Sequence, residues 1–494
     1  MPEGSRQATA RSTGFWLLFA LALALRVWKI TDKNLWLDES TSWSLATGSV
    51  AHLVAWTAAD IHPPLYYLLL KGWIGIEGDS LAGLRSLSVV ASLVALYLLV
   101  RLAAGVVPRA VALAVALGFA VSPHAIYYSQ EARMYASVTA VVLGGCLAYR
   151  RWVESGFERR RALVAYAACA TAALYLHYFT ALVFVAIWIH LIVLSLGRRG
   201  PSGASAPAPR PRWGAWLVAH AAIGVLYLPW IGTAIAQITR GRSWRQAVTI
   251  GQIPDHALEL VRMLTFGLYD VPYFRTLPGA VAISVLGLGL ASLVAVALRH
   301  RDERDTFVLL VAATPIVLGL AALPKTGHMD LSRYLQYAMP LGVLAAARGF
   351  SRLGLGAVVP IGALTAGIVA MGPSLRAYYA DPVKDSDERP VVAYLQANAV
   401  HGSGHPSDTV LIAPGYMITE ARFISRDAIA YEKVETDADL WSAADRHASD
   451  GRPVWLLVDY RWPSFHELGR DVRLREVDVP GGTPAMTRLF RVGH

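Results

Sequence analysis

The feature that most constrains this chain is a series of long apolar runs without a single charged residue. They cover residues 134–149, 178–197, 213–239, 276–298 and 306–324. A helix of about 20 apolar residues can cross a bilayer, because its backbone polar groups are bonded within the segment. Only 16% of the 494 residues are charged, against roughly 25% in an ordinary soluble protein. The sequence therefore predicts an all-α polytopic membrane protein.

Short basic loops between these runs predict its orientation. They lie at 101–109, 150–161, 198–212, 299–304 and 348–352. Because Lys and Arg collect on the cytoplasmic side of a membrane, we expect these loops and the N-terminal tail to be cytoplasmic. The net charge of +10 then needs no nucleic-acid partner. The segment 201–211, rich in Pro, Ala and Ser, is expected to be a flexible cytoplasmic linker.

The early topology follows from this orientation. The first run ends in Arg26, Trp28 and Lys29, not in a small-residue cleavage site, so we expect the first helix to be retained. The first helix ends outside the cell, whereas the basic loop at 101–109 is expected inside, so an odd number of membrane crossings must lie between them. The apolar run at 82–100 supplies one crossing. The stretch 65–76, about twelve residues long, is too short to span.

We therefore interpret 42–57 and 64–76 as two interfacial helices in the first external loop. Counting onward predicts about eleven spanning helices, near 14–30, 82–100, 109–121, 134–149, 162–176, 178–197, 213–236, 277–298, 306–323, 334–347 and 353–371. The two cysteines, Cys146 and Cys169, fall in these spans and are expected to be small buried apolar residues without a disulfide.

The tail differs in kind, because it is charged throughout and punctuated by Gly and Pro. Its apolar stretches predict strands at 409–413 and 454–459 and helices at 389–399 and 437–449. About 120 residues suffice for one small domain. The predicted organisation is a cytoplasmic tail (1–13), a transmembrane domain (14–373) and an extracytoplasmic α/β domain (374–494). The tail's glycines fit no phosphate-loop spacing, which leaves it a structural or acceptor-binding role.

An acidic pair, Asp38-Glu39, directly follows the first apolar run. A carboxylate at the membrane surface could act as a general base or could ligate a divalent cation. The alternative without a catalytic or binding role is a solvated acidic turn after a helix. His62 stands before Pro63 and Pro64, which hold it at the start of an interfacial helix, where it could contact a phosphate, a metal or a substrate.

Three arginines stand at the external ends of predicted helices: Arg85, Arg133 and Arg333. Each alone could simply extend toward lipid headgroups. Together, at the depth of a carboxylate pair, they indicate a pocket for an anion such as a lipid phosphate, because the guanidinium fork matches phosphate oxygens. Glu131 is placed to pair with Arg133.

The order of these motifs resembles the glycosyltransferase C superfamily. Within it, the chain looks like the bacterial relatives of dolichyl-phosphate-mannose protein mannosyltransferases and of lipid A aminoarabinose transferases. The resemblance covers about residues 14–350 and rests on Leu37-Asp38-Glu39, His62-Pro63-Pro64-Leu65-Tyr66-Tyr67, Leu84-Arg85-Ser86-Leu87-Ser88, Tyr128-Ser129-Gln130-Glu131-Ala132-Arg133-Met134-Tyr135, and Arg333-Tyr334 with Pro340.

This resemblance implies an inverting transfer of a sugar, mannose or another hexose or pentose, from a polyprenyl-phosphate donor. The acceptor would be a hydroxyl of a glycan, lipid or protein outside the cell (inner) membrane. It implies catalytic roles for Asp38 and Glu39, with Asp38 as the base. Candidate contacts of the donor phosphate are Arg85, Arg133, His62 and Arg333, and candidate substrate contacts are Tyr66, Tyr67, Tyr128, Glu131 and Tyr334. His62 stands where the aminoarabinose branch has a lysine. No cofactor is required, although Asp38, Glu39 and His62 could hold a divalent cation.

Two rival functions stay open. A transporter or lipid flippase typically places polar residues near the bilayer midplane and often has repeated halves, whereas here the charges cluster on one predicted face and we see no internal repeat. A membrane-anchored binding protein would leave the external carboxylates and arginines unexplained.

Overall fold

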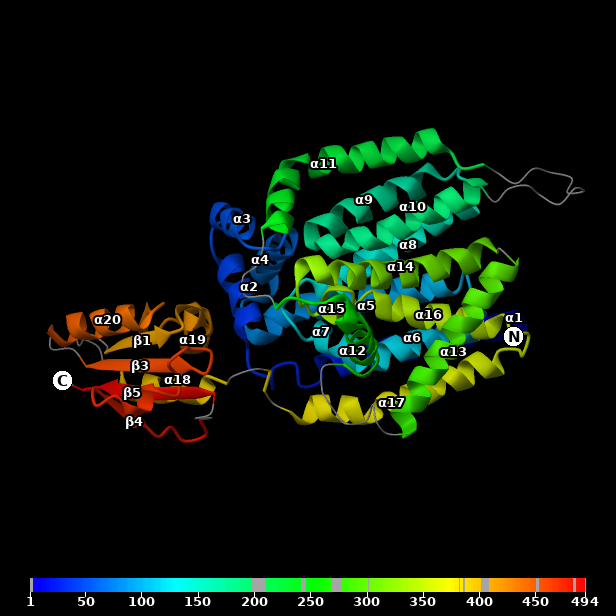
Figure 1. The fold of residues 1–494 in the computed structure, drawn as a ribbon. Helices are drawn as coiled ribbons and strands as arrows, with labels where there is room; N and C mark the ends of the chain where they lie inside the picture. The colour runs from blue at the N-terminus through cyan, green and yellow to red at the C-terminus, as the bar shows by residue number, and fades with distance from the viewer. Residues whose placement is uncertain are drawn as a thin grey trace, which may run out of the picture. The chain divides into compact units, whose positions relative to one another are not determined.

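The computed structural model describes residues 3–196, 210–240, 246–267, 277–300, 302–381, 383–384, 387–400, 408–449, 453–482 and 486–493. The chain forms two compact units (Figure 1). The helical unit consists of Met1–Ile30 and Ser49–Ala380, and the C-terminal unit consists of Thr31–Gly48 and Asp381–His494. A short N-terminal segment, 31–48, is therefore built into the C-terminal unit. Of the linker predicted at 201–211, all but residues 210 and 211 lie outside the described residues.

Every span predicted from the sequence overlaps a helix of the helical unit. The helices are α1 (Glu3–Val27), α3 (Val50–Ala59), α4 (Leu65–Glu77), α5 (Leu81–Ala103), α6 (Arg109–Val121), α7 (Pro123–Ser129), α8 (Tyr135–Glu154), α9 (Arg160–Leu176), α10 (Ala181–Leu196), α11 (Trp213–Thr239), α12 (Ile253–Phe266), α13 (Leu277–His300), α14 (Glu303–Thr326), α15 (Leu331–Tyr334), α16 (Ala338–Ser351) and α17 (Val358–Ala380), with 3-10 turns η1 (Tyr178–Thr180) and η2 (Ile250–Gln252).

Among the described residues, five helices are long and apolar enough to cross a membrane: Leu81–Ala103, Tyr178–Leu196, Trp213–Thr239, Glu303–Thr326 and Val358–Ala380. The pair α6 and α7 also qualifies, but it is bent by 57°. The bend lies at Pro123, which starts α7 after Ser122 has capped it by accepting from the Ala125 amide at 3.2 Å. These helices make the chain a multi-pass membrane protein. The total of about eleven spans and their sidedness remain predictions.

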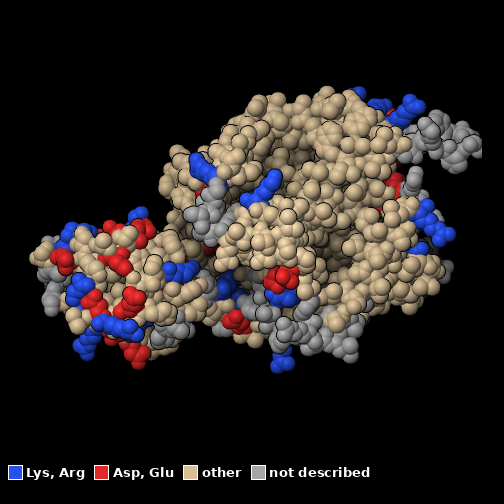
Figure 2. Space-filling model, in the orientation of Figure 1, with Lys and Arg blue, Asp and Glu red and all other residues tan. Residues whose placement is uncertain are grey.

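The surface of the helical unit fits a lipid environment. On α11, Val218, Val225 and Leu228 are 70%, 64% and 60% exposed. In Figure 2 the visible face of this unit has broad areas without Lys, Arg, Asp or Glu, whereas the C-terminal unit carries both signs of charge. Such continuous exposed apolar area is unusual for a protein surrounded by water. Figure 1 also shows a bend in α11, which contains Pro229, a residue that removes one helical hydrogen bond.

Small residues allow the helices of this unit to approach closely. An added Cβ at Gly144 would lie 3.2 Å from the Cys169 sulfur of α9, and one at Gly145 would lie 3.4 Å from Phe184 of α10. Figure 1 shows α8, α9 and α10 side by side. Both cysteines are free, Cys146 buried and Cys169 half-buried, as expected for small apolar residues.

The predicted interfacial helix at 42–57 is wrong. Its residues belong to two helices, α2 (Leu37–Thr47) and α3, which are separated at Gly48 and Ser49. Both of these residues have extended backbones, and the Ser49 hydroxyl caps α3 by accepting from the His52 amide at 3.2 Å. An N-cap residue is not helical itself, so one helix cannot continue through it. The other predicted helix, at 64–76, is present as α4, which starts after Pro64; its interfacial position stays a prediction.

The C-terminal unit is an α/β structure around one sheet. Its strands are β1 (Thr409–Ala413), β2 (Ala430–Lys433), β3 (Val454–Asp459), β4 (Leu474–Val477) and β5 (Thr487–Val492). They lie in the order β2-β1-β3-β5-β4. β1 is parallel to β2 and β3, and β5 is antiparallel to β3 and β4. The predicted strands at 409–413 and 454–459 are confirmed.

Helices cover both faces of this sheet. Leu411 and Ala413 pack with α20 (Asp437–Ser449) on one face, and Val410 and Ile412 pack with α18 (Arg389–Asn398) and α19 (Ile418–Ser425) on the other. Because successive side chains of a strand point to opposite faces, a strand covered on both sides is apolar throughout. The predicted helices at 389–399 and 437–449 are confirmed as α18 and α20. Short 3-10 turns at Gly415–Met417 (η4) and Leu468–Arg470 (η5) complete the unit.

Candidate active site

The acidic pair lies in the first turn of α2, within the C-terminal unit. The first turn of a helix stabilises carboxylates, because unpaired amide groups there carry partial positive charge. The two side chains differ in their surroundings. Glu39 is fully buried, and its Oε2 lies 3.4 Å from Nζ of Lys384, which is also fully buried. Asp38 is partly exposed.

A cavity of about 420 Å³ lies in the helical unit. Its walls come from the segment before α4, from η1, and from the C-terminal ends of α11 and α14. Polar residues that line it include His62, Gln237, Arg240, Lys325 and Tyr334. Small-molecule sites typically enclose about 300–1,000 Å³. The cavity is thus large enough for a sugar or a phosphate headgroup, and it carries positive charge.

His62 links two charged groups at the wall of this cavity. Its Nδ1 lies 3.0 Å from Oδ2 of Asp60, and its Nε2 lies 3.4 Å from Nη2 of Arg133. With Nδ1–H donating to Asp60, the ring turns its Nε2 toward the guanidinium. Nη1 of Arg133 also donates to the Tyr67 hydroxyl at 3.0 Å. These contacts therefore connect four side chains in series: Asp60, His62, Arg133 and Tyr67.

The environment of Asp60 favours its charged form. Burial by itself raises the pKa of the Asp60 carboxyl. The hydrogen bond and attraction of His62, the Ile61 amide and the charge of Arg133 together outweigh burial and hold this pKa below its usual value of 3.8. An ionised Asp60 in turn holds the His62 ring in one orientation.

Arg85 is a buried residue in the second turn of α5, and its Nη1 donates to the carbonyl oxygen of Ile30 at 2.7 Å. Ser88, three residues later on the same helix face, donates to the carbonyl of Arg133 at 3.2 Å. The structure thus places Arg85 and Arg133 at the same end of the helical unit, as their predicted positions require.

Arg333 and Tyr334 lie on α15. Nε of Arg333 is 3.6 Å from Oδ2 of Asp330, and its guanidinium carbon is 5.9 Å from the centre of the Tyr135 ring. Tyr334 lines the cavity and lies 4.8 Å, between ring centres, from His177. Of the predicted site residues of this unit, only His62 and Tyr334 line the cavity, while the others that were expected to touch substrate are buried: Tyr66, Tyr67, Tyr128 and Glu131.

Residues 61–208 match the family of dolichyl-phosphate-mannose-protein mannosyltransferases, a range that contains His62, Arg85 and Arg133. No curated protein sequence matches the chain. The crystal structure of ArnT from Cupriavidus metallidurans in the apo state is similar, with a TM-score of 0.62 at 13% identity over 97% of this chain and 98% of that one. The predicted resemblance to the glycosyltransferase C superfamily is confirmed.

Two further solved structures have a similar fold. ArnT from Cupriavidus metallidurans bound to undecaprenyl phosphate has the same TM-score of 0.62, identity of 13%, and coverage of 97% and 98%. The Archaeoglobus fulgidus oligosaccharyltransferase tethered with an acceptor peptide has a TM-score of 0.57 at 11% identity, over 91% of this chain and 69% of that one. At these identities the likeness is one of fold.

Sequence reasoning missed several residues of the site. Asp60 stands two positions before His62, and only the structure shows that it orients the imidazole. His177, Gln237 and Arg240 come from distant helix ends that meet at the cavity. Lys325 also lines the cavity, and its charge directly after the predicted span at 306–323 was a usable signal.

The predicted cation site remains untested. Among the residues that the structure describes, no group of three or more His, Cys, Asp or Glu side chains is arranged to hold a metal ion. Ligation of a divalent cation by Asp38, Glu39 or His62 therefore stays a prediction.

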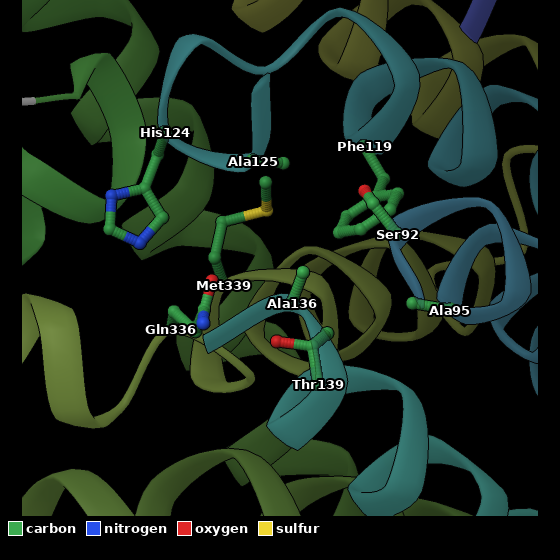
Figure 3. A pocket seen from close by; sticks show the side chains of 9 residues that line it. All are labelled: Ser92, Ala95, Phe119, His124, Ala125, Ala136, Thr139, Gln336 and Met339. Atoms are coloured by element: carbon green, nitrogen blue, oxygen red, sulfur yellow. The ribbon is translucent and has the colours of Figure 1, made fainter. Parts of the chain in front are cut away.

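A second cavity in the helical unit is far smaller, about 10 Å³ (Figure 3). His124 and Gln336 line it together with Ser92 and Thr139 and with apolar side chains such as Phe119. A space of this size holds one water molecule at most. It is therefore a feature of helix packing and not a second substrate site.

Proposed function

We propose that the protein is an inverting glycosyltransferase that moves a sugar from a polyprenyl-phosphate donor to an acceptor hydroxyl on the extracytoplasmic face of the cell membrane. One observation carries the proposal. Inside the range that matches the mannosyltransferase family, His62 stands at the wall of a cationic cavity and is fixed between Asp60 and Arg133.

The reaction makes one bond and breaks one bond. The acceptor oxygen attacks C1 of the sugar from the side opposite the carrier, so the configuration inverts. The bond between C1 and the phosphate oxygen breaks, and the polyprenyl phosphate leaves with a second negative charge. Cations already fixed around that oxygen lower the barrier, because they need no reorganisation as the charge grows. The proton of the acceptor hydroxyl passes to a nearby base.

In this proposal the base is Asp38, and the phosphate is held by cations of the helical unit. Arg133 is preorganised for this task, since Tyr67 and His62 restrain its guanidinium. Arg85 and Arg333 are further phosphate contacts, and Tyr334 contacts the substrate at the cavity wall. In this proposal Tyr66, Tyr67, Tyr128 and Glu131 are further substrate contacts.

The wider assignments are proposals too. The fold is shared with a protein whose structure holds undecaprenyl phosphate and with one tethered to an acceptor peptide, which supports a lipid-linked donor and a polar acceptor. The basic loops support an extracytoplasmic site. The sugar is mannose or another hexose or pentose, and the acceptor is a glycan, a lipid or a protein.

The test uses the purified full-length protein with a panel of polyprenyl-phosphate sugars and measures release of polyprenyl phosphate. Removing a general base lowers turnover by about 10²- to 10⁴-fold, so we expect such a loss in Asp38→Asn. Asp445→Asn, which changes an exposed acid of the C-terminal unit, should retain activity. If no donor reacted and Asp38→Asn also left the glycans of cells unchanged, the proposal would be wrong.

The same assay tests the phosphate contact. Arg133→Lys keeps the charge but replaces the planar fork, whose Nη1 and Nη2 reach Tyr67 and His62 separately, with a single nitrogen. We expect the donor KM to rise about tenfold, since two charge-assisted contacts are weakened. Arg101→Lys is a matched control, because Nη1 of Arg101 also donates to a tyrosine, Tyr97, at 2.7 Å. Arg101 lies in the last turn of α5, whereas Ser88, which contacts Arg133, lies near the start of this helix. Equal changes of the donor KM in the two variants would show that Arg133 does not contact the phosphate.

A further inference from the structure

The acidic pair sits on a segment that the C-terminal unit builds into itself. The chain leaves the helical unit after Ile30 and re-enters it at Ser49. Between them, the Asn34 side chain accepts from the Lys384 amide at 2.8 Å, and the Ser40 and Thr419 hydroxyls lie 2.8 Å apart. These contacts join residues that are 350 and 379 positions apart in the chain.

Apolar and charged contacts extend this attachment. The rings of Trp43 on α2 and Phe423 on α19 meet edge to face, with centres 5.3 Å apart. Nη1 of Arg389 donates to the carbonyl oxygen of Asp32 at 3.0 Å. The segment is therefore held from Asp32, before α2, to Trp43 in the middle of that helix.

The Lys384–Glu39 pair is the centre of this attachment. Nζ and Oε2 are 3.4 Å apart, and neither side chain has any exposed surface. A buried charge without its partner is strongly destabilising, because it has lost its hydration and gains nothing in return. Lys384 is thus a partner that offsets the cost of burying the Glu39 carboxylate.

This arrangement separates two carboxylates that are neighbours in the sequence. Adjacent residues of a helix point about 100° apart. With Glu39 turned into the C-terminal unit and paired there, the rotation of α2 about its axis is set, and with it the direction of the partly exposed Asp38. Displacing a reacting group by about 1 Å can cost about 10²-fold in rate, so this rotation bears directly on a base.

We propose that Lys384 is a positioning residue for the base: it anchors Glu39, and through α2 it holds Asp38 in place for proton transfer. The inference rests on the proposed function. It assigns the C-terminal unit a part in the reaction, because the unit supplies the anchor for the segment that carries the base.

The test compares Lys384→Met, which removes the charge, with Lys384→Arg, which keeps it. Lys433→Met is the matched control, since Lys433 pairs with Glu435 in the same unit at 3.7 Å but with side chains 67% and 57% exposed. Three measurements are made on the full chain: hydrogen exchange over residues 37–47, kcat, and affinity for polyprenyl phosphate alone.

We expect Lys384→Met to raise exchange over 37–47 and to lower kcat by about tenfold to a hundredfold, with little change in affinity for polyprenyl phosphate. Lys384→Arg should recover most of both losses, and Lys433→Met should resemble the wild type. The double variant Glu39→Gln with Lys384→Met leaves no unpaired buried charge, so its exchange should be lower than that of Lys384→Met alone.

Two results would overturn the inference. Unchanged exchange over 37–47 in Lys384→Met would remove the anchor, whatever the activity of the protein. A loss of affinity for polyprenyl phosphate as large as the loss of kcat would remove the positioning role. Because exchange is measured without any sugar donor, the anchor can be tested even if the wild type transfers no sugar.

Discussion

At the residue scale, the behaviour of His62 depends on the two side chains that flank it. Asp60 accepts from one ring nitrogen at 3.0 Å, and Arg133 faces the other at 3.4 Å. A free imidazole could rotate or exchange its tautomer, whereas this one is held at both nitrogens. The cavity wall therefore presents a histidine whose ring is held in a fixed orientation by Asp60 and by the buried Arg133.

The Asp60 carboxyl provides a prediction for pH dependence. Its folded pKa lies below 3.8, so its contribution to stability is fully present above the unfolded pKa of about 3.9 and is lost as the pH falls through the lower folded value. We expect Asp60→Asn to lower the free energy of unfolding by about 1 kcal/mol near pH 7. The melting temperatures of both proteins, measured in detergent between pH 7 and pH 3, should converge only at the acidic end. A difference that widened as the pH fell would contradict this sign.

At the scale of elements, the crossing of α13 and α16 depends on two glycines. A Cβ at Gly289 would lie 2.9 Å from the Cβ of Ala346, and a Cβ at Gly349 would overlap the carbonyl oxygen of Gly289. The backbones of the two helices are therefore in contact, which is the type of packing that small residues permit in membranes. Neither helix is among the described helices that qualify as spans by themselves. We therefore expect the packing of α13 against α16 to stabilise both helices.

We expect Gly349→Ala to cost about 1–3 kcal/mol, because the added methyl group meets backbone, which cannot move aside as a side chain can. Gly342→Ala on the same helix is the control, since nothing lies within 4 Å of its added Cβ. There alanine should be neutral or stabilising by less than about 1 kcal/mol. Thermal unfolding in detergent measures both, and similar melting temperatures for the two variants would show that the helices do not pack this closely.

At the scale of the whole molecule, two units of different composition share one chain. The helical unit exposes apolar side chains, and the C-terminal unit buries an apolar core on both faces of its sheet. A lipid environment suits the first and water suits the second. The side of the membrane on which the loops and the C-terminal unit lie is predicted by the basic loops.

Cysteine labelling tests that sidedness. In a background with Cys146→Ala and Cys169→Ala, a single cysteine replaces Arg160, at the exposed start of α9, or Val472, which is 99% exposed in the C-terminal unit. An impermeant maleimide should label Val472→Cys in intact cells and should label Arg160→Cys only after lysis. The reverse pattern would invert the predicted orientation.

Local patterns were enough to predict most elements. The apolar runs predicted the helices, because a chain in lipid must bond its own backbone groups, and short apolar stretches predicted β1 and β3 because both faces of those strands are covered. The motifs also placed His62 at the start of α4. The unbroken helix at 42–57 was wrong, since its apolar content outweighed the capping signal at Ser49.

The sequence by itself thus determined the multi-pass helical unit, the α/β tail and the residue types of the site, because period, length and charge are local properties. Only the tertiary structure decided which residues meet. Residues 31–48 join a unit whose other residues begin at 381, Lys384 pairs with Glu39, and Asp60 and Arg133 flank His62. Such pairings depend on contacts between distant segments and on the cost of burying each charge without its partner, and no local pattern encodes either.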